Sequence, residues 1–441
     1  MTRLCVATVA GSDPSGGAGL QTDLRVFTLL GAYGQAVVTA LTVQNSLGVK
    51  DWQPVSGPLV YDQLQAIFED FPPQALKTGM LATAEVMEAV AEALSRYRPL
   101  LVVDPVLVAQ SGVPLLEEKA LSVLKDKIIP LATVVTPNLP EAQVLTGKEE
   151  PQEILSELKA LGAKAVVLKG GHAEGPQVRD VLFDGERNLS FEVPRVEGPL
   201  GHGTGCTFSA ALTVFLAQGH PLPEAVFKAQ RFVYLGLLAA QKGPLGRGVS
   251  PLDHLIHLDR LKAGREVLEA LKAAVQRFCA APVRALIPEV QTNLAYALPF
   301  AQDFQEVAAI PGRIVAFGQG ARAVGCPEFG ASRHVANVVL TAMRYDPLQR
   351  AAINIRFQER YLQRARDLGL VVGEFSRAEE PPFVKAQEGS TLVWGVDQVC
   401  KRLGKVPDLI ADRGDLGKEP MIRILGKDPQ EVVEKALKFL C

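Results

Sequence analysis

The chain has 441 residues, enough for two or three domains with large cores. Its 46 basic and 48 acidic residues nearly cancel, which argues against a dedicated surface for nucleic acid or membrane. No apolar run approaches the about 18 residues of a membrane helix, and residues 4–10 are too few for a signal peptide. The 6 cysteines show neither CxxC spacing nor the density of a disulfide framework, so we expect a cytoplasmic protein.

The first half of the chain alternates predicted strands and helices. Residues 4–10 predict a buried strand, residues 11–19 a glycine-rich loop and residues 20–30 a helix. This alternation predicts an α/β fold with a mainly parallel sheet covered by helices on both faces. Further strands are expected at 36–43, 75–78, 100–103, 133–136 and 165–168.

Several candidate site residues follow these strands, at the edge where ligands bind in such sheets. Each falls just after a predicted strand or at its end: Gln44, Lys77, Met80, Asp104, Asn138, Glu141 and Lys169. Further along, GHGTGC at 201–206 precedes an apolar helical run. Small residues let backbone amides approach an anion, and a helix start adds positive potential, so this turn indicates a phosphate site.

Each of these residues also has a purely structural interpretation. Cys206 fits a small packed residue, Met80 an ordinary core residue and Asp104 the cap of a turn. A glycine-rich turn before a helix is likewise often a packing feature. It is their occurrence together at successive strand ends that favours a functional site.

Seven blocks in the first half carry a more specific signal. The blocks are AGSDPSGGAGLQTDL (10–24), VTALTVQNSLGV (38–49), KTGML (77–81), VVDPVLVAQSG (102–112), TPNLPEA (136–142), LKGGH (168–172) and GHGTGCTFSAAL (201–212). Together they resemble the hydroxymethylpyrimidine/phosphomethylpyrimidine kinases of thiamine synthesis, which have the ribokinase-like fold. The resemblance implies ATP-dependent phosphorylation of the hydroxymethylpyrimidine, first to its monophosphate and then to the diphosphate.

Residue roles for phosphoryl transfer follow from charge and from the family pattern. A loose transition state needs positive charge and alignment more than a strong base. Lys169 and the backbone amides of the turn supply the positive potential. Asp104 and Glu141 offer oxygen ligands for Mg²⁺, and Asn138 is a further candidate beside ATP. The amides of the anion hole belong to Gly203, Thr204, Gly205 and Cys206.

The acceptor side has its own candidates. Gln44 carries an amide that matches a pyrimidine ring nitrogen and its exocyclic amine, Met80 can cover a ring face, and the resemblance adds Gly11. Cys206 stands where most ribokinase-like enzymes have an aspartate base. A free thiol is only about 3% ionised at neutral pH, so the helix start and Lys169 are expected to raise that fraction. Asp23 is the second candidate for handling the substrate hydroxyl.

One position departs from the family pattern. Gly201, preceded by Leu200, stands where family members usually carry a threonine after an asparagine. The departure affects the approach to the anion hole and leaves its amides in place.

The kinase half is expected to span 1–255, followed by a helical linker at 256–282 and a second, smaller α/β domain at 283–441. Gly243–Pro251 is rich in turn residues, and residues 258–278 have an amphipathic helical pattern. In the second half, Gly318–Ala323 matches a GxGxxA dinucleotide motif. We reject that interpretation, because Pro327 interrupts a following helix and no carboxylate follows at the distance that ribose recognition needs.

Four blocks of the second half have a better explanation. These are IPGRIVAFG (310–318), FGASRHVANVVLTAMRYDP (329–347), AINIRF (352–357) and PDLIADRGDLGKEPMIRILG (407–426). They resemble the archaeal-type thiamine-phosphate synthase domain, which joins the pyrimidine diphosphate to hydroxyethylthiazole phosphate and releases pyrophosphate. Matching the motif residue by residue implies a catalytic pair, Arg313 and His334.

Departure of diphosphate from the pyrimidine methylene leaves charge that the protein must stabilise. Arg356 and Lys418 are further cations for it, and Asp412, Asp415 or Glu419 are possible Mg²⁺ ligands. The same residues have structural interpretations, since the DRGD segment at 412–415 also fits a turn.

Two alternatives stay open. The second half could be a non-catalytic thiamine-phosphate sensor, although no basic helix-turn-helix precedes it. The whole chain could be a pyridoxal kinase-like enzyme with an appended binding domain. In either case the expected partners are small molecules together with a second copy of the chain, in a homodimer formed through the kinase domain.

Overall fold

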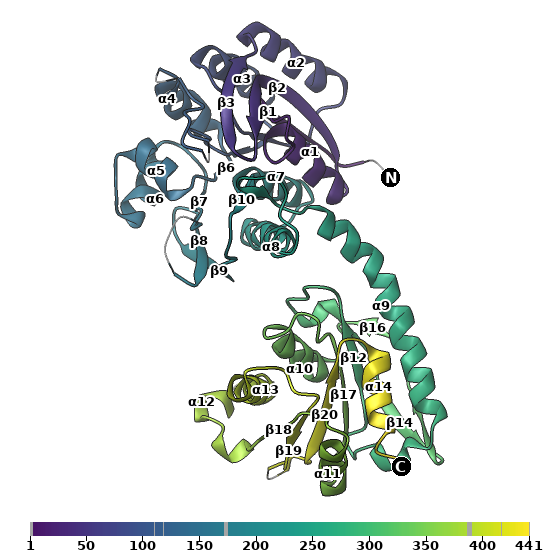
Figure 1. The fold of residues 1–441 in the computed structure, drawn as a ribbon. Helices are drawn as coiled ribbons and strands as arrows, with labels where there is room; N and C mark the ends of the chain where they lie inside the picture. Colours follow the sequence, from purple (N-terminus) through teal and green to yellow (C-terminus); the bar gives the residue numbers. More distant parts are fainter. Residues whose placement is uncertain are drawn as a thin grey trace. The chain divides into compact units, whose positions relative to one another are not determined.

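The computed structural model describes residues 3–109, 111–117, 119–171, 175–385, 390–415 and 417–440. The chain folds into two compact units, residues 1–258 and residues 259–441 (Figure 1). Each unit is a sheet with helices on both of its faces.

The sheet of the first unit is mainly parallel. From β2 to β7 every neighbouring pair of strands is parallel, while β3, β8 and β9 add antiparallel edges. The predicted doubly covered parallel sheet is therefore confirmed. In sheet order the strands are β3 (Gly48–Pro54), β2 (Tyr33–Asn45), β1 (Cys5–Ser12), β4 (Ala75–Thr78), β5 (Leu100–Val103), β6 (Val134–Val135), β7 (Val166–Leu168), β8 (Gln177–Phe183) and β9 (Asn188–Pro194).

Alternation along the strands divides the core of this unit between two faces. Leu101 and Val103 of β5 belong to one apolar cluster, and Val102 belongs to the other, because successive side chains of a strand point to opposite faces. The first cluster is covered by α2 (Gly57–Asp70), α3 (Ala84–Tyr97), α4 (Ala120–Val123), α5 (Leu139–Thr146) and α6 (Pro151–Ala160). The second is covered by α1 (Gly19–Leu29), α7 (Thr204–Ala217) and α8 (Leu222–Ala240).

Two helices of this unit begin at the predicted site residues. The side chain of Asn138 accepts a hydrogen bond from the Glu141 backbone N–H (2.8 Å), and Glu141 accepts one from the Asn138 N–H (2.8 Å), which forms a capping box at the start of α5. Helix α7 begins after Gly203, whose φ of +80° only glycine adopts readily. A Cβ at Gly203 would lie 1.9 Å from the Gly17 carbonyl oxygen, so this turn requires glycine.

The second unit is built on a mostly antiparallel sheet, and among its described strands β18 and β19 form the parallel pair. In sheet order its strands are β16 (Glu328–Phe329), β13 (Val307–Ala309), β12 (Leu294–Ala297), β17 (Ala351–Arg356), β20 (Met421–Gly426), β19 (Leu409–Asp412) and β18 (Val372–Phe375). Its helices are α9 (Leu255–Ala280), α10 (Arg333–Met343), α11 (Glu359–Asp367), α12 (Pro382–Lys385), α13 (Ser390–Leu403) and α14 (Pro429–Leu437).

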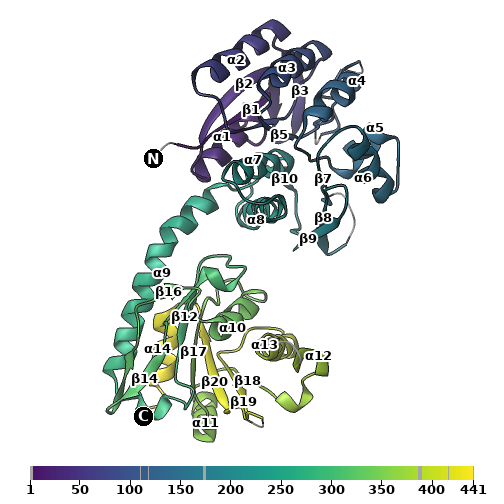
Figure 2. The same ribbon diagram turned by 180° about the vertical axis from the view of Figure 1, so that it is seen from behind.

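The helix predicted as a linker belongs mostly to this second unit. Val267, Leu271 and Phe278 of α9 are buried in the same apolar cluster as residues of α11 and α14, on the face of the sheet opposite α10 and α13 (Figure 2). The boundary between the units falls after Leu258. The apolar stripe of the helix explains the difference, because a helix with such a stripe buries it against a sheet when one is adjacent.

Two smaller features complete the fold. Strands β14 (Ile314–Phe317) and β15 (Gly320–Ala323) form an antiparallel hairpin, so the GxGxxA match lies in a turn and an edge strand rather than at a helix start, as we inferred. In the first unit, β10 (Leu200–His202) pairs in parallel with β11 (Ser250–Pro251) just before α7. Within the described residues, no helix combines the length and apolar character needed to span a bilayer.

Candidate active site

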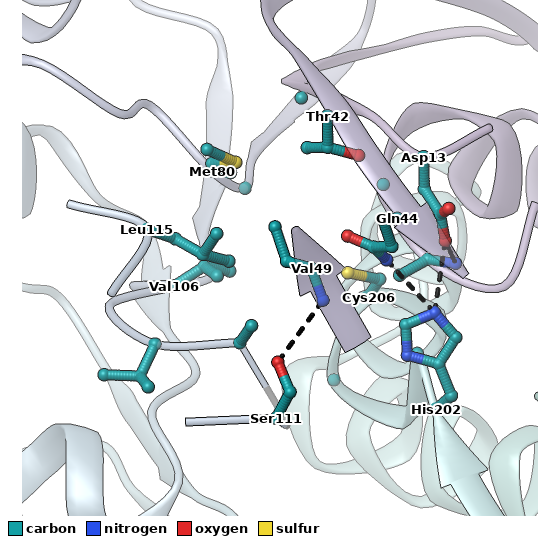
Figure 3. Close-up of a pocket in the computed structure, with 18 of the residues that line it drawn as sticks. Asp13, Thr42, Gln44, Val49, Met80, Val106, Ser111, Leu115, His202 and Cys206 are labelled. Carbon is teal, nitrogen blue, oxygen red and sulfur yellow. Dashed lines mark hydrogen bonds and ion pairs between the residues drawn. The ribbon is translucent and has the colours of Figure 1, made fainter. Parts of the chain in front are cut away.

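A cavity of about 460 Å³ opens at the carboxyl ends of the parallel strands in the first unit (Figure 3). It collects residues from the glycine loop after β1, from β2 and β3, and from the turn before α7. Most of the residues predicted for the kinase site line it: Gly11, Gln44, Met80, Asp104, Asn138, Glu141, Lys169, Gly203, Thr204, Gly205 and Cys206.

Lys169 and Asp104 form an ion pair at the wall of this cavity. Lys169 Nζ lies 2.9 Å from Asp104 Oδ1, and Ser209 Oγ donates to Asp104 Oδ2 (3.1 Å). Burial raises the pKa of Asp104, but Lys169, Lys77 and these hydrogen bonds outweigh it, so the pKa lies below its ordinary value. Burial lowers the pKa of Lys169, and the carboxylates of Asp104 and Glu141 more than restore it. Both groups are therefore charged at neutral pH.

Glu141 has a different electrostatic environment from its neighbour Asp104. Burial and the nearby Asp104 carboxylate raise the pKa of Glu141 to about 7, against the opposing effect of Lys169. Its protonation therefore changes close to neutral pH, and its charge responds to any cation that enters the cavity.

The environment of Cys206 opposes ionisation of its thiol. Burial raises its pKa to about 11, and the positive charge of Lys77 is opposed by the carboxylates of Asp23 and Asp104. The sequence led us to expect a larger thiolate fraction at the start of α7, and the structure shows the opposite direction. The cause is desolvation, which exceeds the favourable effect of the helix start.

Asp23 is not at the cavity. It is fully buried, with Oδ2 accepting from Thr8 Oγ1 (2.6 Å) and Oδ1 lying 3.1 Å from Lys77 Nζ. Both oxygens are thus occupied within the core, and Asp23 does not line the space where a substrate hydroxyl would bind. Its observed role is the buried ion pair with Lys77, whose charges act on Cys206.

A second cavity, of about 280 Å³, adjoins the first. Asp180, Gln230 and Tyr234 are among the residues around it. The two cavities share a wall made of Asn138, Lys169, Gly201, Thr204 and Gly205.

The glycine that departs from the family pattern lies in this shared wall. Gly201 has a φ of +113°, a conformation that L side chains rarely adopt. Any other residue at this position would be strained in the observed backbone.

The sequence did not reveal the role of two residues at the large cavity. His202 Nε2 lies 3.1 Å from Asp13 Oδ2 and 3.2 Å from the side-chain amide of Gln44. Both His202 and Asp13 stand inside motifs that we recognised, but a motif does not say which of its polar side chains meet. That contact depends on β10 and the loop after β1 lying side by side.

In the second unit, no contact between Arg313 and His334 occurs among the described residues. Gly330 N donates to the Val307 carbonyl, which places the approach to His334 at the start of β13. Arg313 follows the other end of β13, and its guanidinium donates to the Val290 carbonyl. In the same turn, the Glu419 carboxylate accepts from the backbone N–H groups of residues 289 and 290 (2.9 and 3.0 Å). The backbone segments that lead to the two residues thus leave β13 at different ends, and the catalytic pair stays a prediction.

The two further cations predicted for the second unit, Arg356 and Lys418, lie near the strand ends close to Arg313. Arg356, at the end of β17, pairs with Met421, the first residue of β20. Lys418 precedes Met421 by three residues. Arg356 and Lys418 therefore both lie near the strand ends that carry Val290 and Arg313. Lys418 and Asp415 are exposed and face each other across a turn.

Asp412 is a correction to the predicted metal ligands. It is buried between Arg377 (2.8 Å) and Arg423 (2.6 Å), whose guanidinium groups engage both carboxylate oxygens. Burial raises the pKa of Asp412, and the two arginines hold it below the ordinary value. This ion-pair cluster leaves no free oxygen for Mg²⁺.

Comparison with known proteins accounts for both units. Residues 13–253 match the family of phosphomethylpyrimidine kinase, and residues 270–438 match thiamine-phosphate synthase ThiN. The chain belongs to the phosphomethylpyrimidine kinase family. We therefore call residues 1–258 the kinase unit and residues 259–441 the synthase unit.

Individual relatives agree with this division. The chain is 33% identical over 437 residues to the bifunctional thiamine biosynthesis protein ThiDN of Methanocaldococcus jannaschii, covering 98% of this chain and 97% of that protein. It is 48% identical over 260 residues to the bifunctional protein ThiED of Geobacter sulfurreducens, which covers 58% of this chain but 53% of the relative. That second match spans little more than half of either chain.

Solved structures resemble the kinase unit. Pyridoxal kinase from Staphylococcus aureus in complex with ADP is 33% identical, with a TM-score of 0.53 over 58% of this chain and 94% of that one. An ADP complex of Bacillus subtilis pyridoxal kinase gives 33% identity and a TM-score of 0.52. The predicted ribokinase-like architecture is confirmed.

Proposed function

We propose that the chain is a bifunctional enzyme of thiamine biosynthesis. The kinase unit phosphorylates 4-amino-5-hydroxymethyl-2-methylpyrimidine with ATP, first to the monophosphate and then to the diphosphate. The synthase unit joins that diphosphate to hydroxyethylthiazole phosphate and releases pyrophosphate. The full-length similarity to a bifunctional thiamine biosynthesis protein supports the pairing of the two activities in one chain.

The observation that carries the kinase assignment is the shared wall between the two cavities. A phosphoryl group must pass from a nucleotide to an acceptor, and the wall holds the backbone amides of Thr204 and Gly205 together with the Lys169 ammonium. We assign the acceptor to the larger cavity and the nucleotide to the smaller one. The transferred group then crosses where positive charge is concentrated.

Residues of the wall and of the acceptor cavity have separate tasks in this transfer. The turn at 203–205 directs N–H groups of the first turn of α7 towards the transferred phosphoryl, where no intrahelical acceptor competes for them. The ammonium of Lys169 neutralises charge that develops on the equatorial oxygens, and Asp104 holds that ammonium in position at 2.9 Å. Gln44 and Met80 hold the pyrimidine ring in the acceptor cavity.

Cys206 is the proposed acceptor for the proton of the substrate hydroxyl. Its pKa of about 11 makes the thiolate a minor species at neutral pH and a strong base once formed. The second phosphorylation makes no such demand, because a phosphate monoester acceptor already carries an ionised oxygen at neutral pH. The same anion site can therefore serve both steps while the thiol serves only the first.

Mg²⁺ is proposed as the metal of the kinase unit. Asp104 and Glu141 both line the acceptor cavity, and carboxylate oxygens are ligands that Mg²⁺ prefers. No group of three or more His, Cys, Asp or Glu side chains suited to a metal occurs among the described residues, so the ion would be held mainly by nucleotide phosphates and water. When bound, it neutralises phosphate charge.

For the synthase unit we propose a diphosphate site at the sheet end that carries Arg313, Arg356 and Lys418. Three cations at one edge suit a leaving group that carries several negative charges. Asp415 in the adjoining turn stays a candidate for a metal held through the diphosphate. His334 stays a prediction of the family resemblance.

The kinase unit is also proposed to form a homodimer. Leu41 and Val43 of β2 are 59% and 55% exposed, next to the edge strand β3, which gives the unit an apolar surface. Light scattering at several protein concentrations measures the mass directly.

We expect a cytoplasmic protein, because the described cysteines are all free thiols, as in a reducing compartment.

Substrate preference tests the kinase assignment. The similarity to pyridoxal kinases makes pyridoxal the competing acceptor. We expect kcat/KM with ATP to be higher for the hydroxymethylpyrimidine than for pyridoxal. We also expect a diphosphate to accumulate from the pyrimidine and not from pyridoxal. Efficient use of pyridoxal with no pyrimidine diphosphate would contradict the assignment.

A further inference from the structure

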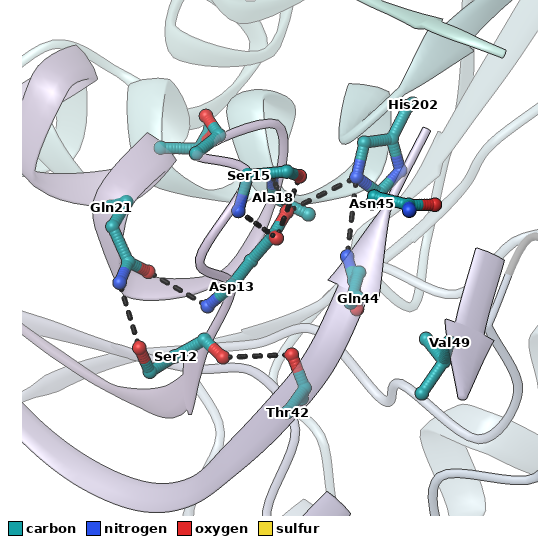
Figure 4. Close-up of polar contacts among 12 residues, drawn as sticks. Ser12, Asp13, Ser15, Ala18, Gln21, Thr42, Gln44, Asn45, Val49 and His202 are labelled. Atoms are coloured by element: carbon teal, nitrogen blue, oxygen red, sulfur yellow. Dashed lines mark hydrogen bonds and ion pairs between the residues drawn. The ribbon is translucent and has the colours of Figure 1, made fainter. Parts of the chain in front are cut away.

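His202 lies between Asp13 and Gln44 at the wall of the acceptor cavity (Figure 4). Its Nε2 atom is 3.1 Å from Asp13 Oδ2 and 3.2 Å from Gln44 Nε2. The three side chains come from β10, from the loop after β1 and from β2. The reaction as described so far uses only Gln44.

Asp13 can only accept hydrogen bonds. Its Oδ1 accepts from the backbone N–H and the hydroxyl of Ser15 (2.8 and 2.7 Å), and Oδ2 accepts from the Ala18 N–H (2.8 Å). Burial raises the pKa of Asp13, but the hydrogen bonds from His202, Ser15 and Ala18 outweigh it, and the pKa lies below its ordinary value. The carboxylate is therefore ionised, with no proton to donate.

It follows that His202 carries a proton on Nε2. An imidazole nitrogen 3.1 Å from a carboxylate oxygen bonds to it only as a donor. The ring lies against the Gly17 backbone, since a Cβ at Gly17 would lie 2.2 Å from His202 Cδ2. Glycine at position 17 thus lets the imidazole approach closely enough to reach Asp13.

This proton determines which end of the Gln44 amide faces His202. An N–H donor cannot bond to an NH₂ group, whereas it bonds well to an amide oxygen. The oxygen and nitrogen of a glutamine amide have nearly the same shape, so their assignment follows from the hydrogen-bond network. In Figure 4 the Gln44 nitrogen faces His202. Because the single Nε2 hydrogen of His202 is shared between Asp13 Oδ2 and the Gln44 amide, the network requires the amide turned, with its oxygen on the His202 side and its NH₂ group on the far side.

We propose that His202, held by Asp13, fixes the orientation of the Gln44 amide and thereby the orientation of the aminopyrimidine ring. The inference rests on the proposed kinase function. The exocyclic amine of the substrate donates to the Gln44 oxygen on the His202 side, and the adjacent ring nitrogen accepts from the Gln44 NH₂ group. His202 is a positioning residue, because it acts through Gln44 rather than on the reacting atoms.

The arrangement gives the site a way to reject the deaminated ring. When an oxo group replaces the amine, the exocyclic atom becomes an acceptor and the adjacent ring nitrogen carries a proton. Pairing with that ring requires the reversed Gln44 amide, which would set the NH₂ group against the His202 N–H. Discrimination between the two rings therefore depends on His202 as well as on Gln44.

The test compares kcat/KM for the amino ring and its oxo analogue in the full-length protein. In His202→Ala the Gln44 amide is free to turn, and we expect the preference for the amino ring to fall about tenfold or more, the effect of one mispaired hydrogen bond. His202→Gln retains an N–H donor between Asp13 and Gln44, so it should keep the parental preference. His220→Ala, which removes a histidine elsewhere in the kinase unit, should not change it.

An equal fall of kcat/KM for both rings in His202→Ala, with the preference unchanged, would overturn the proposal and leave His202 a structural role. Nitrogen NMR of the ligand-free parent, assigned by comparison with His202→Gln, provides an independent readout. We expect a proton on Nε2 of His202, and a neutral ring protonated on Nδ1 alone would also overturn the proposal. Failure of the parent to phosphorylate the amino ring would instead contradict the kinase assignment, and the NMR result would still decide the amide orientation.

Discussion

In the kinase unit the strands from β2 to β7 are parallel and end at one edge of the sheet, whereas in the synthase unit most neighbouring strands are antiparallel and end at alternate edges. Residues that follow successive strands of the kinase unit therefore meet in one cavity, as Asp104, Asn138 and Lys169 do. In the synthase unit, the backbone segments that lead to Arg313 and His334 leave β13 at different ends. The direction of the strands thus decides whether neighbouring motifs form one site.

The buried ion pairs of the two units differ in whether they line a cavity. Lys169 and Asp104 keep 13% and 2% of their side chains exposed, and the pair lines a cavity. Arg423 and Asp412 are 7% and 0% exposed, with Arg377 closing the cluster from the other side. The first pair is within reach of a ligand in the cavity, and the second is enclosed between β19, β20 and Arg377.

The largest effect is expected from Lys169→Ala. Loss of the ammonium from the shared wall should lower both phosphorylations by about 10³-fold, as for a group that stabilises charge mainly in the transition state. Lys164→Ala, an exposed lysine before β7, is the matched control and should leave both rates unchanged. A parental rate in the Lys169 variant would remove the shared wall as the path of the phosphoryl group.

Cys206→Ala should separate the two phosphorylations. We expect a loss of about 10²-fold in the first step and a smaller one in the second, whose acceptor is already ionised. Because the pKa of Cys206 is about 11, the thiolate fraction and the rate of the first step should rise with pH between 7 and 9 in the parent and not in the variant. Cys326→Ala, at an exposed thiol, is the control, and equal losses in both steps would argue against a base.

Arg313→Ala and His334→Ala sharpen the comparison in the synthase unit. With pyrimidine diphosphate supplied, Arg313→Ala should slow thiamine phosphate formation about 30- to 1000-fold, the value of one charge-assisted contact to the leaving group. His334→Ala should have a smaller effect, and both variants should keep normal kinase activity. Arg322→Ala in β15 controls for surface charge. Equal losses at unchanged melting temperature would mean that the two residues act in one site after all.

The smallest effects are expected from two helix caps of the same kind. Asn138 Oδ1 accepts from the Glu141 N–H and Asp428 Oδ1 accepts from the Glu431 N–H, each at 2.8 Å. Replacing either cap by alanine should cost about 1 kcal/mol of unfolding free energy in its own unit. Only Asn138→Ala should also raise the KM for ATP, because Asn138 lies in the shared wall. A similar kinase defect in Asp428→Ala would contradict the independence of the two sites.

Much of the kinase unit could be predicted because its signals are local. Strands at 75–78 and 100–103 have the predicted bounds, and periodicity together with glycine turns is enough to find them. The ionisation of Cys206 could not be predicted, since burial depends on every element packed around it. Asp23 was misplaced for a similar reason, because its partner Lys77 is 54 residues away in the chain. In the synthase unit, the motifs indicated the family and a smaller α/β domain, but not which ends of the antiparallel strands carry the motif residues.

One reaction mixture tests the central claim most directly. The purified full-length chain is incubated with ATP, Mg²⁺, the hydroxymethylpyrimidine and hydroxyethylthiazole phosphate, and the products are separated by chromatography and mass spectrometry. We expect thiamine phosphate, with pyrimidine diphosphate accumulating when the thiazole is omitted. Accumulation of the diphosphate with no thiamine phosphate in the complete mixture would contradict the account of a second catalytic unit.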